Sequence, residues 1–204
     1  MSLLSATVSV SRYLIEEKIE GPLIETITQG LKKNTIIDID NEDMEQSVGW
    51  TSFDDPFKPD FEGSSFIIDN YFVFSLRIDR KKVPAKIIQK HYLLAIAERL
   101  SSTGKQYISR NEKAEIKEDV IQRLTKRIPA TPNVYDLLWN YEASSLCFFS
   151  TQKAANEELE TLFNKSFELH LIRLFPYTTA EYKADLTDEQ RDALGKLSPF
   201  SFTE

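Results

Sequence analysis

The sequence is poor in the residues from which disulfides and zinc sites are built, with one cysteine and two histidines in 204 residues. Cys147 has no second cysteine with which to form a disulfide in the chain, and chains without disulfides are typical of the cytoplasm. His91 and His170 lie far apart and show none of the ligand spacings of a zinc site. We therefore expect a cytoplasmic protein without a metal centre.

Long hydrophobic runs are also absent. No apolar stretch approaches the roughly 18–20 residues that cross a bilayer. Residues 1–13 lack the basic and apolar regions of a signal peptide. We therefore expect no contact with a membrane. The composition is 41% hydrophobic and 28% charged, which is that of a globular chain with a substantial core.

The common catalytic signatures are missing as well. The chain has no G-x-S-x-G, no P-loop and no G-x-G-x-x-G. Cys147 lies in the apolar run LCFF, and buried cysteines of this kind are inert. We therefore expect neither a cofactor nor a catalytic site.

Two acidic stretches are the remaining candidates for metal binding. Residues 38–43 resemble the start of a calcium loop. That loop needs Gly at its sixth position, where the chain has Asp43, and Glu at its twelfth, where it has Gly49. A metal-dependent nuclease needs carboxylates that converge on a divalent ion, and residues 54–60 offer three aspartates. Prolines and a glycine around them favour a solvated loop instead.

The pattern of apolar residues and turn signals predicts an α+β fold. Hairpins dominate, which favours a mostly antiparallel sheet with helices packed on it. The run 66–78 is either one long strand or, as we favour, a hairpin that turns at 69–70. We expect a single domain over 1–180, with a helical sub-region at 84–128, and then a short helix and peripheral tail over 181–204. The other predicted strands are 3–15, 46–52, 134–141, 144–150 and 167–175, and the predicted helices are 22–33, 84–102, 110–127, 151–164 and 187–195.

Positive charge is concentrated in one segment, residues 77–128. That segment has fourteen Lys and Arg against six acids, which gives +8; because the whole chain carries −7, the remainder carries −15. A basic segment on an acidic body is the electrostatic pattern of a protein that binds a phosphate backbone. The alternative is a pair of amphipathic helices whose solvated faces are rich in Lys.

The candidate DNA-binding residues lie at a strand end and along the two predicted helices. Lys86 and Lys90 are four residues apart and share a helix face. Lys126 and Arg127 close the second helix, where the helix dipole alone would also account for them. Because no zinc finger, RRM or OB-like pattern is present, we expect phosphate contact without sequence preference. The candidates are Arg77, Arg80, Lys81, Lys82, Lys86, Lys90, Arg110, Lys113, Lys117, Lys126 and Arg127.

At these residues the sequence resembles the RdgC family of recombination-associated proteins. The resemblance extends over about residues 5–176. Its most specific part is the pairing of RKKVPA with E-K-x-x-I-K-x-x-V at the spacing found here. The matching stretches are Gly49-Trp50, LRIDRKKVPAKII at 76–88, NEKAEIKEDVIQRL at 111–124, and a hairpin followed by STQKAANEELETLF at 150–163 and an apolar strand.

Members of this family bind double-stranded DNA with little sequence preference, as ring-shaped dimers with a positive central hole, and they restrain the RecA recombinase by occupying DNA. The resemblance therefore implies a non-catalytic, nucleoid-associated modulator of recombination or replication. It also implies a homodimer and a functional link to a RecA-type recombinase. It carries DNA contact onto Arg80, Lys81, Lys82 and Lys86, and onto Lys113, Lys117 and Arg127.

The chain departs from the family in two places. After the second helix the family has Leu-Pro-Arg-Ala-Phe, with an aromatic at the ring interface, whereas this chain has TKRIP at 125–129. The chain also stops soon after the strand predicted at 167–175, so the resemblance implies a short form without the family's C-terminal region. Two other interpretations stay open. One is a protein-interaction scaffold that has lost DNA binding; the other is a metal-dependent exonuclease, which rests on an older family label alone.

Overall fold

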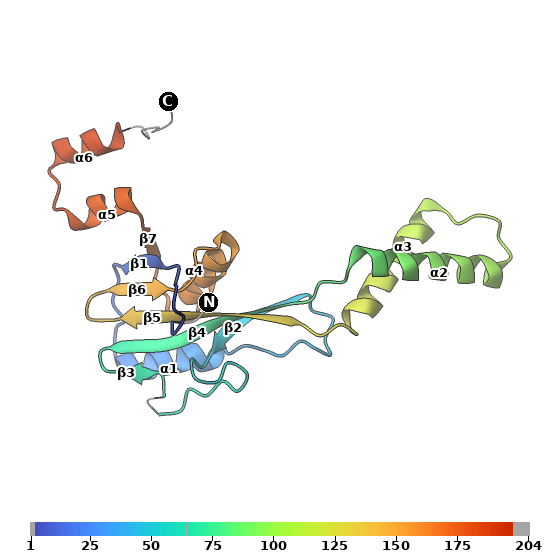
Figure 1. Ribbon diagram of the computed structural model, residues 1–204, viewed down its shortest axis with the longest axis horizontal. Coiled ribbons are helices and arrows are strands. Elements are labelled where there is room, and N and C mark those ends of the chain that lie inside the picture. Colours follow the sequence, from blue (N-terminus) through green and yellow to red (C-terminus); the bar gives the residue numbers. More distant parts are fainter. Residues whose placement is uncertain (1–2, 64, 198–204) are drawn as a thin grey trace.

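The computed structural model describes residues 3–63 and 65–197, and it consists of a helix-covered sheet, a helical arm and a C-terminal pair of helices (Figure 1). The sheet combines strands from both halves of the chain, and the arm is inserted between two of its central strands. All pairings between these strands are antiparallel. The predicted α+β class with an antiparallel sheet is therefore confirmed.

Seven strands of the described chain form one sheet in the order β2-β4-β5-β6-β1-β7, with β3 paired to β4. β1 pairs with β6 on one side and β7 on the other, so the N-terminal strand is enclosed by strands from the C-terminal half. The strands are β1 (Ser11–Ile15), β2 (Gln46–Thr51), β3 (Ile67–Ile68), β4 (Tyr71–Arg80), β5 (Thr131–Asn140), β6 (Ser145–Phe148) and β7 (Leu171–Leu174).

The two longest strands, β4 and β5, run side by side over their whole lengths. Their register begins at Tyr71 opposite Asn140 and ends at Arg80 opposite Thr131. Arg80 is the last residue of β4 and Thr131 is the first of β5, so the chain leaves and re-enters the sheet at neighbouring positions. Residues 81–130 are therefore an insertion that is attached to the sheet at two adjacent points.

Helices α1 (Leu23–Lys33) and α4 (Lys153–Phe167) pack on one face of the sheet and enclose an aromatic core. The strands contribute Trp50, Phe74 and Trp139, and α4 contributes Phe163 and Phe167. The centroids of contacting rings in this cluster lie 4.9–6.4 Å apart. Contacts of this kind add to the large apolar area that each ring buries, so the cluster anchors α4 to the sheet.

The arm consists of α2 (Ala85–Thr103) and α3 (Arg110–Thr125), which project together from the ends of β4 and β5 (Figure 1). The two helices pack on each other, and in the described chain neither makes extensive contact with another helix or strand. Gly104 ends α2 with φ 64°, a left-handed conformation that glycine adopts at little cost. The predicted capping box of Ser109 and Glu112 begins α3.

The hairpin favoured for residues 66–78 is present, because β3 turns into β4 at Asp69 and Asn70. Asp69 has φ 52°, as the tight turn between paired strands requires. The strand predicted over 3–15 is shorter, and only Ser11–Ile15 pairs. Helix α4 continues to Phe167, so the strand predicted at 167–175 starts at Leu171 instead.

The C-terminal region contains two helices, α5 (Pro176–Lys183) and α6 (Asp188–Gly195). The sequence predicts α6, which Thr187 caps, but it does not predict α5. The tail predicted after α6 falls partly outside the described residues, which end at Leu197. Over the residues that the structure describes, no helix combines the length and apolar character needed to span a bilayer.

Candidate nucleic-acid interface

Helix α2 has no buried residue and exposes apolar and basic side chains together. Ile87, Leu93 and Leu94 are 40%, 58% and 57% exposed. The predicted DNA contacts Lys86 and Lys90 are exposed as well, and helical spacing places them on the same side of α2 as these apolar residues. The outer side of α2 therefore combines positive charge with apolar surface.

Helix α3 carries three cations on one face and three acids on the opposite face, while its other two charged residues, Glu118 and Arg123, do not follow this pattern. The exposed cations Arg110, Lys113 and Lys117 follow the i, i+3, i+7 spacing of a single helix face. Three acids have the same spacing but begin two residues later in the sequence. Because two residues correspond to a rotation of about 200° around an α-helix, these acids lie on the opposite face from the three cations. The acidic face consists of Glu112, Glu115 and Asp119.

Two grooves between α2 and α3 reflect this separation. One, of about 280 Å³, is lined by Glu112, Glu115 and Asp119 of α3 together with Glu98 and Arg99 of α2. The other, of about 380 Å³, has Lys117 as its only charged lining residue in the described chain and is otherwise formed by the N-terminal half of α2. The first groove is therefore mainly acidic, and the second offers one cation beside mostly apolar side chains.

The capping box keeps the acidic face charged from the start of α3. The carboxylate of Glu112 accepts a hydrogen bond from the backbone N–H of Ser109 at 3.0 Å and one from Nζ of Lys105 at 3.0 Å. The Ser109 backbone bond, followed by the Lys105 and Ser109 side chains, lowers the pKa of Glu112 from 4.5 to about 2.

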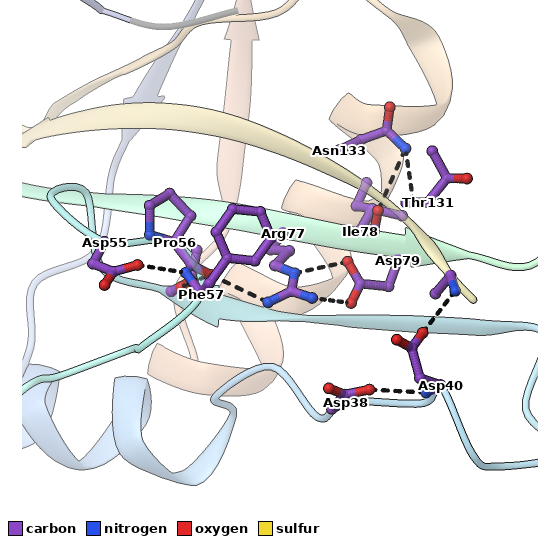
Figure 2. Close-up of polar contacts among 12 residues, drawn as sticks. Asp38, Asp40, Asp55, Pro56, Phe57, Arg77, Ile78, Asp79, Thr131 and Asn133 are labelled. Atoms are coloured by element: carbon purple, nitrogen blue, oxygen red, sulfur yellow. Dashed lines mark hydrogen bonds and ion pairs between the residues drawn. The ribbon is translucent and has the colours of Figure 1, made fainter.

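Arg77 is engaged within the protein (Figure 2). Its guanidinium donates to both carboxylate oxygens of Asp79 at 2.8 and 2.6 Å, and to the backbone oxygen of Pro56 at 3.2 Å. The ring of Phe57 lies 4.9 Å from its central carbon. Asp79 is 1% exposed, so Arg77 neutralises a buried carboxylate and fastens the loop before β3 to β4. The phosphate contact expected at Arg77 from the sequence is therefore replaced by contacts within the protein.

Lys81 is likewise turned inward and is 7% exposed. Its ammonium donates to the backbone oxygens of Asp40, Glu42 and Thr125 at 3.0, 2.9 and 3.1 Å. The expected phosphate contact at Lys81 is therefore corrected, because all three donors of the ammonium are already used inside the protein.

Arg80 and Lys126 are exposed but paired. Arg80 donates from Nε to the side-chain oxygen of Gln46 at 2.9 Å, and its Nη2 lies 4.0 Å from Glu158. Nζ of Lys126 lies 3.0 Å from a carboxylate oxygen of Asp43. Exposed pairs of this kind contribute only about 0–1 kcal/mol, so a phosphate can replace either acid at little cost.

The remaining seven of the eleven candidates are exposed cations. Within residues 3–63 and 65–197, none of their side chains makes a hydrogen bond or ion pair with the protein. Five of them lie on the two helices of the arm, and Lys82 and Arg127 lie where the arm joins the sheet. The seven are Lys82, Lys86, Lys90, Arg110, Lys113, Lys117 and Arg127.

Two of the three aspartates considered for a nuclease, Asp55 and Asp60, have local roles. Asp55 accepts a hydrogen bond from the backbone N–H of Phe57 at 3.0 Å, and Asp60 accepts one from that of Glu62 at 2.8 Å. These bonds shape turns, as the solvated-loop interpretation expects. In the described part of the chain, no group of three or more His, Cys, Asp or Glu side chains is arranged to hold a metal ion.

Sequence reasoning missed the role of the acidic run at 38–43. This segment crosses the base of the arm, where Asp43 contacts Lys126 and also accepts from Gln122 at 3.3 Å. Asp40 accepts from the backbone N–H of Ala130 at 2.7 Å. The cluster of acids in the sequence indicated that this segment is unusual. Only the fold shows that it lies opposite the ends of α3 and β4.

Together these features define an α+β protein whose antiparallel sheet carries an inserted helical arm with unpaired cations. The family model described as "Putative exonuclease, RdgC" matches residues 9–188, so the chain belongs to the RdgC family. The resemblance inferred from the sequence is confirmed. The comparison with curated proteins gives no match.

Proposed function

We propose that the chain binds DNA through phosphate contacts made by its arm. The observation that carries this proposal is the face of α3 formed by Arg110, Lys113 and Lys117, whose exposed cations have no partner in the described chain. Three of the four acids of α3 lie on the opposite face. Lys86 and Lys90 on α2 extend the positive charge. Duplex DNA is the expected ligand, as the family resemblance implies.

The rest of the molecule limits where DNA can bind. Residues outside 77–128 carry −15, and like charges repel the phosphate backbone. Contact is therefore confined to the arm and its base, and it is independent of base sequence. As the family resemblance implies, occupying duplex DNA would restrain a RecA-type recombinase that acts on the same DNA.

Fluorescence anisotropy with a labelled duplex tests the proposal at low salt. The variant is Lys113→Glu/Lys117→Glu, which reverses two charges on the basic face of α3. The matched control is Lys33→Glu/Lys165→Glu, which reverses two exposed lysines on α1 and α4. We expect the wild type and the control to bind and the arm variant to lose most of its affinity.

Two results would overturn the proposal. One is a wild type that does not bind duplex DNA at low salt, and the other is an arm variant that binds as tightly as the control. Mg²⁺ added to the same samples tests the exonuclease of the family's description, since release of nucleotides from the labelled end would assign that activity.

A second candidate, contact with another protein molecule, is favoured by the apolar side chains of α2. Ile87, Leu93 and Leu94 are large, exposed and close together on one helix. A homodimer in which this surface is covered is the simplest form of such contact. Light scattering of the wild type and of Leu93→Glu/Leu94→Glu measures it: we expect a dimer that the substitutions dissociate, and a monomeric wild type would contradict this candidate.

A further inference from the structure

The junction of arm and sheet is built around one buried cation, Lys81. It follows β4 directly, and its backbone N–H donates to the backbone oxygen of Glu45 at 2.8 Å. Its ammonium donates to two oxygens of the acidic segment, those of Asp40 and Glu42, and to that of Thr125, the last residue of α3. The side chain therefore joins three parts of the chain that are distant in sequence.

A buried ammonium is stable only when all of its donors are satisfied. Lys81 has three donors and three carbonyl acceptors at 2.9–3.1 Å, so its hydrogen bonding is complete in this one arrangement. The oxygen of Thr125 also lies at the negative end of the α3 dipole, which favours a positive charge. Rotating the arm would move the backbone oxygen of Thr125 away from Lys81 and leave the buried ammonium without one of its three acceptors.

Packing against other helices and strands does little to fix the direction of the arm. Neither α2 nor α3 makes extensive contact with another helix or strand of the described chain. The other polar links at the base in the described chain are the exposed pair of Lys126 and Asp43, the bond from Gln122 to Asp43, and the bond from the backbone N–H of Ala130 to Asp40 at 2.7 Å. Such exposed contacts are weak compared with a fully bonded buried ammonium.

We propose that Lys81 is a positioning residue that sets the direction of the arm relative to the sheet. Its consequence for DNA rests on the proposed function: it would fix the spacing between Lys82 at the sheet end and the basic face of α3. Lys82 is the natural comparison, because it is the same residue type one position later, exposed and without a partner in the described chain.

The distance between two spin labels reports the direction of the arm. In a Cys147→Ser background, one label is attached at Ala97→Cys on α2 and the other at Lys165→Cys on α4, both exposed positions. Lys81→Met and Lys82→Met are measured beside the parent by double electron–electron resonance. We expect a narrow distance distribution for the parent and Lys82→Met, and a broadened or displaced one for Lys81→Met.

Lys81→Gln keeps the measurement informative in case the methionine variant does not fold. It retains two N–H donors but no charge, and we expect a smaller broadening than in Lys81→Met. Circular dichroism verifies that each labelled variant is folded. A folded Lys81 variant with the parent's distance distribution would overturn the proposal.

The same proteins separate this proposal from DNA binding. If the distances change in Lys81→Met but no form binds duplex DNA, the positioning role stands and the proposed function fails. If DNA binding occurs and is lost in the α3 variant while the Lys81 variants keep the parent's distances, the proposed function stands and the positioning role fails.

Discussion

Glu112 is a single half-buried residue whose ionised carboxylate stabilises the start of α3. Its pKa is lowered from 4.5 to about 2, so the folded arm favours the charged carboxylate. A group with a depressed folded pKa contributes stability above its unfolded pKa and loses it as the pH falls through the folded value. We therefore expect the helicity of the arm to benefit from Glu112 at pH 5–7 and to lose this benefit between about pH 4.5 and 2.

Circular dichroism and thermal unfolding of the wild type and Glu112→Gln measure this effect. The two proteins should differ most near neutral pH and converge as the acid limit is approached. Glu115→Gln, on the same face of α3 but outside the capping box, is the control. A difference between wild type and Glu112→Gln that stays constant from pH 7 to 2 would contradict the assigned role.

Residue type and spacing predict much of the candidate interface but not which cations are free. Arg77 and Lys81 lie in the same basic run as Arg80 and Lys82. Arg77 pairs with nearby Asp79 and with distant Pro56, whereas all partners of the Lys81 ammonium are distant in sequence. Because successive side chains of a β-strand point to opposite faces, the sequence indicates that neighbouring cations at the end of β4 point in opposite directions. Only the positions of the acidic segment and of Thr125 decide that Lys81 is the inward one.

At the scale of elements, Gly49 lets β2 pair with the segment after α1. A Cβ at Gly49 would overlap backbone atoms of Ile36 and lie 2.8 Å from the carbonyl carbon of Thr35. That backbone is held by bonds from Ile36 N–H to Trp50 O at 3.0 Å and from Trp50 N–H to Asn34 O at 2.8 Å. The Gly49-Trp50 pair noted in the sequence thus has a steric reason.

We expect Gly49→Ala to lower the free energy of unfolding by about 1–3 kcal/mol or more, because the overlap is with backbone that cannot move alone. Chemical denaturation measures the change. Gly195→Ala is the control, since among the described residues its Cβ would meet only the hydroxyl of Tyr177 at 4.0 Å. Equal stability of Gly49→Ala and wild type would show that this contact does not constrain the sheet edge.

Element boundaries are predictable where the signal is local and not where a partner sets the length. The hairpin turn at Asp69 and the capping boxes of α3 and α6 follow from a few residues. β1 is shorter than its β-branched pattern suggests because its partners β6 and β7 have four residues each. α5 was missed because Thr178, Thr179 and its aromatic residues have low helix propensity.

At the scale of the whole molecule, charge is separated between an acidic body and a basic insertion. The segment 77–128 carries +8 and the remainder −15. The fold places most of this segment on an arm that leaves the sheet at one point (Figure 1). The arm can therefore approach DNA while the body stays away from it.

The salt dependence of duplex binding tests this account most directly, because each phosphate contact releases counterions. We expect log K to fall linearly with log salt, and Lys113→Gln/Lys117→Gln to reduce the steepness by about 0.9 for each contact removed. Lys33→Gln/Lys165→Gln, which removes the same charge from α1 and α4, should leave the slope unchanged. Binding that is independent of salt, or equal slopes for both double variants, would contradict phosphate contact through the arm.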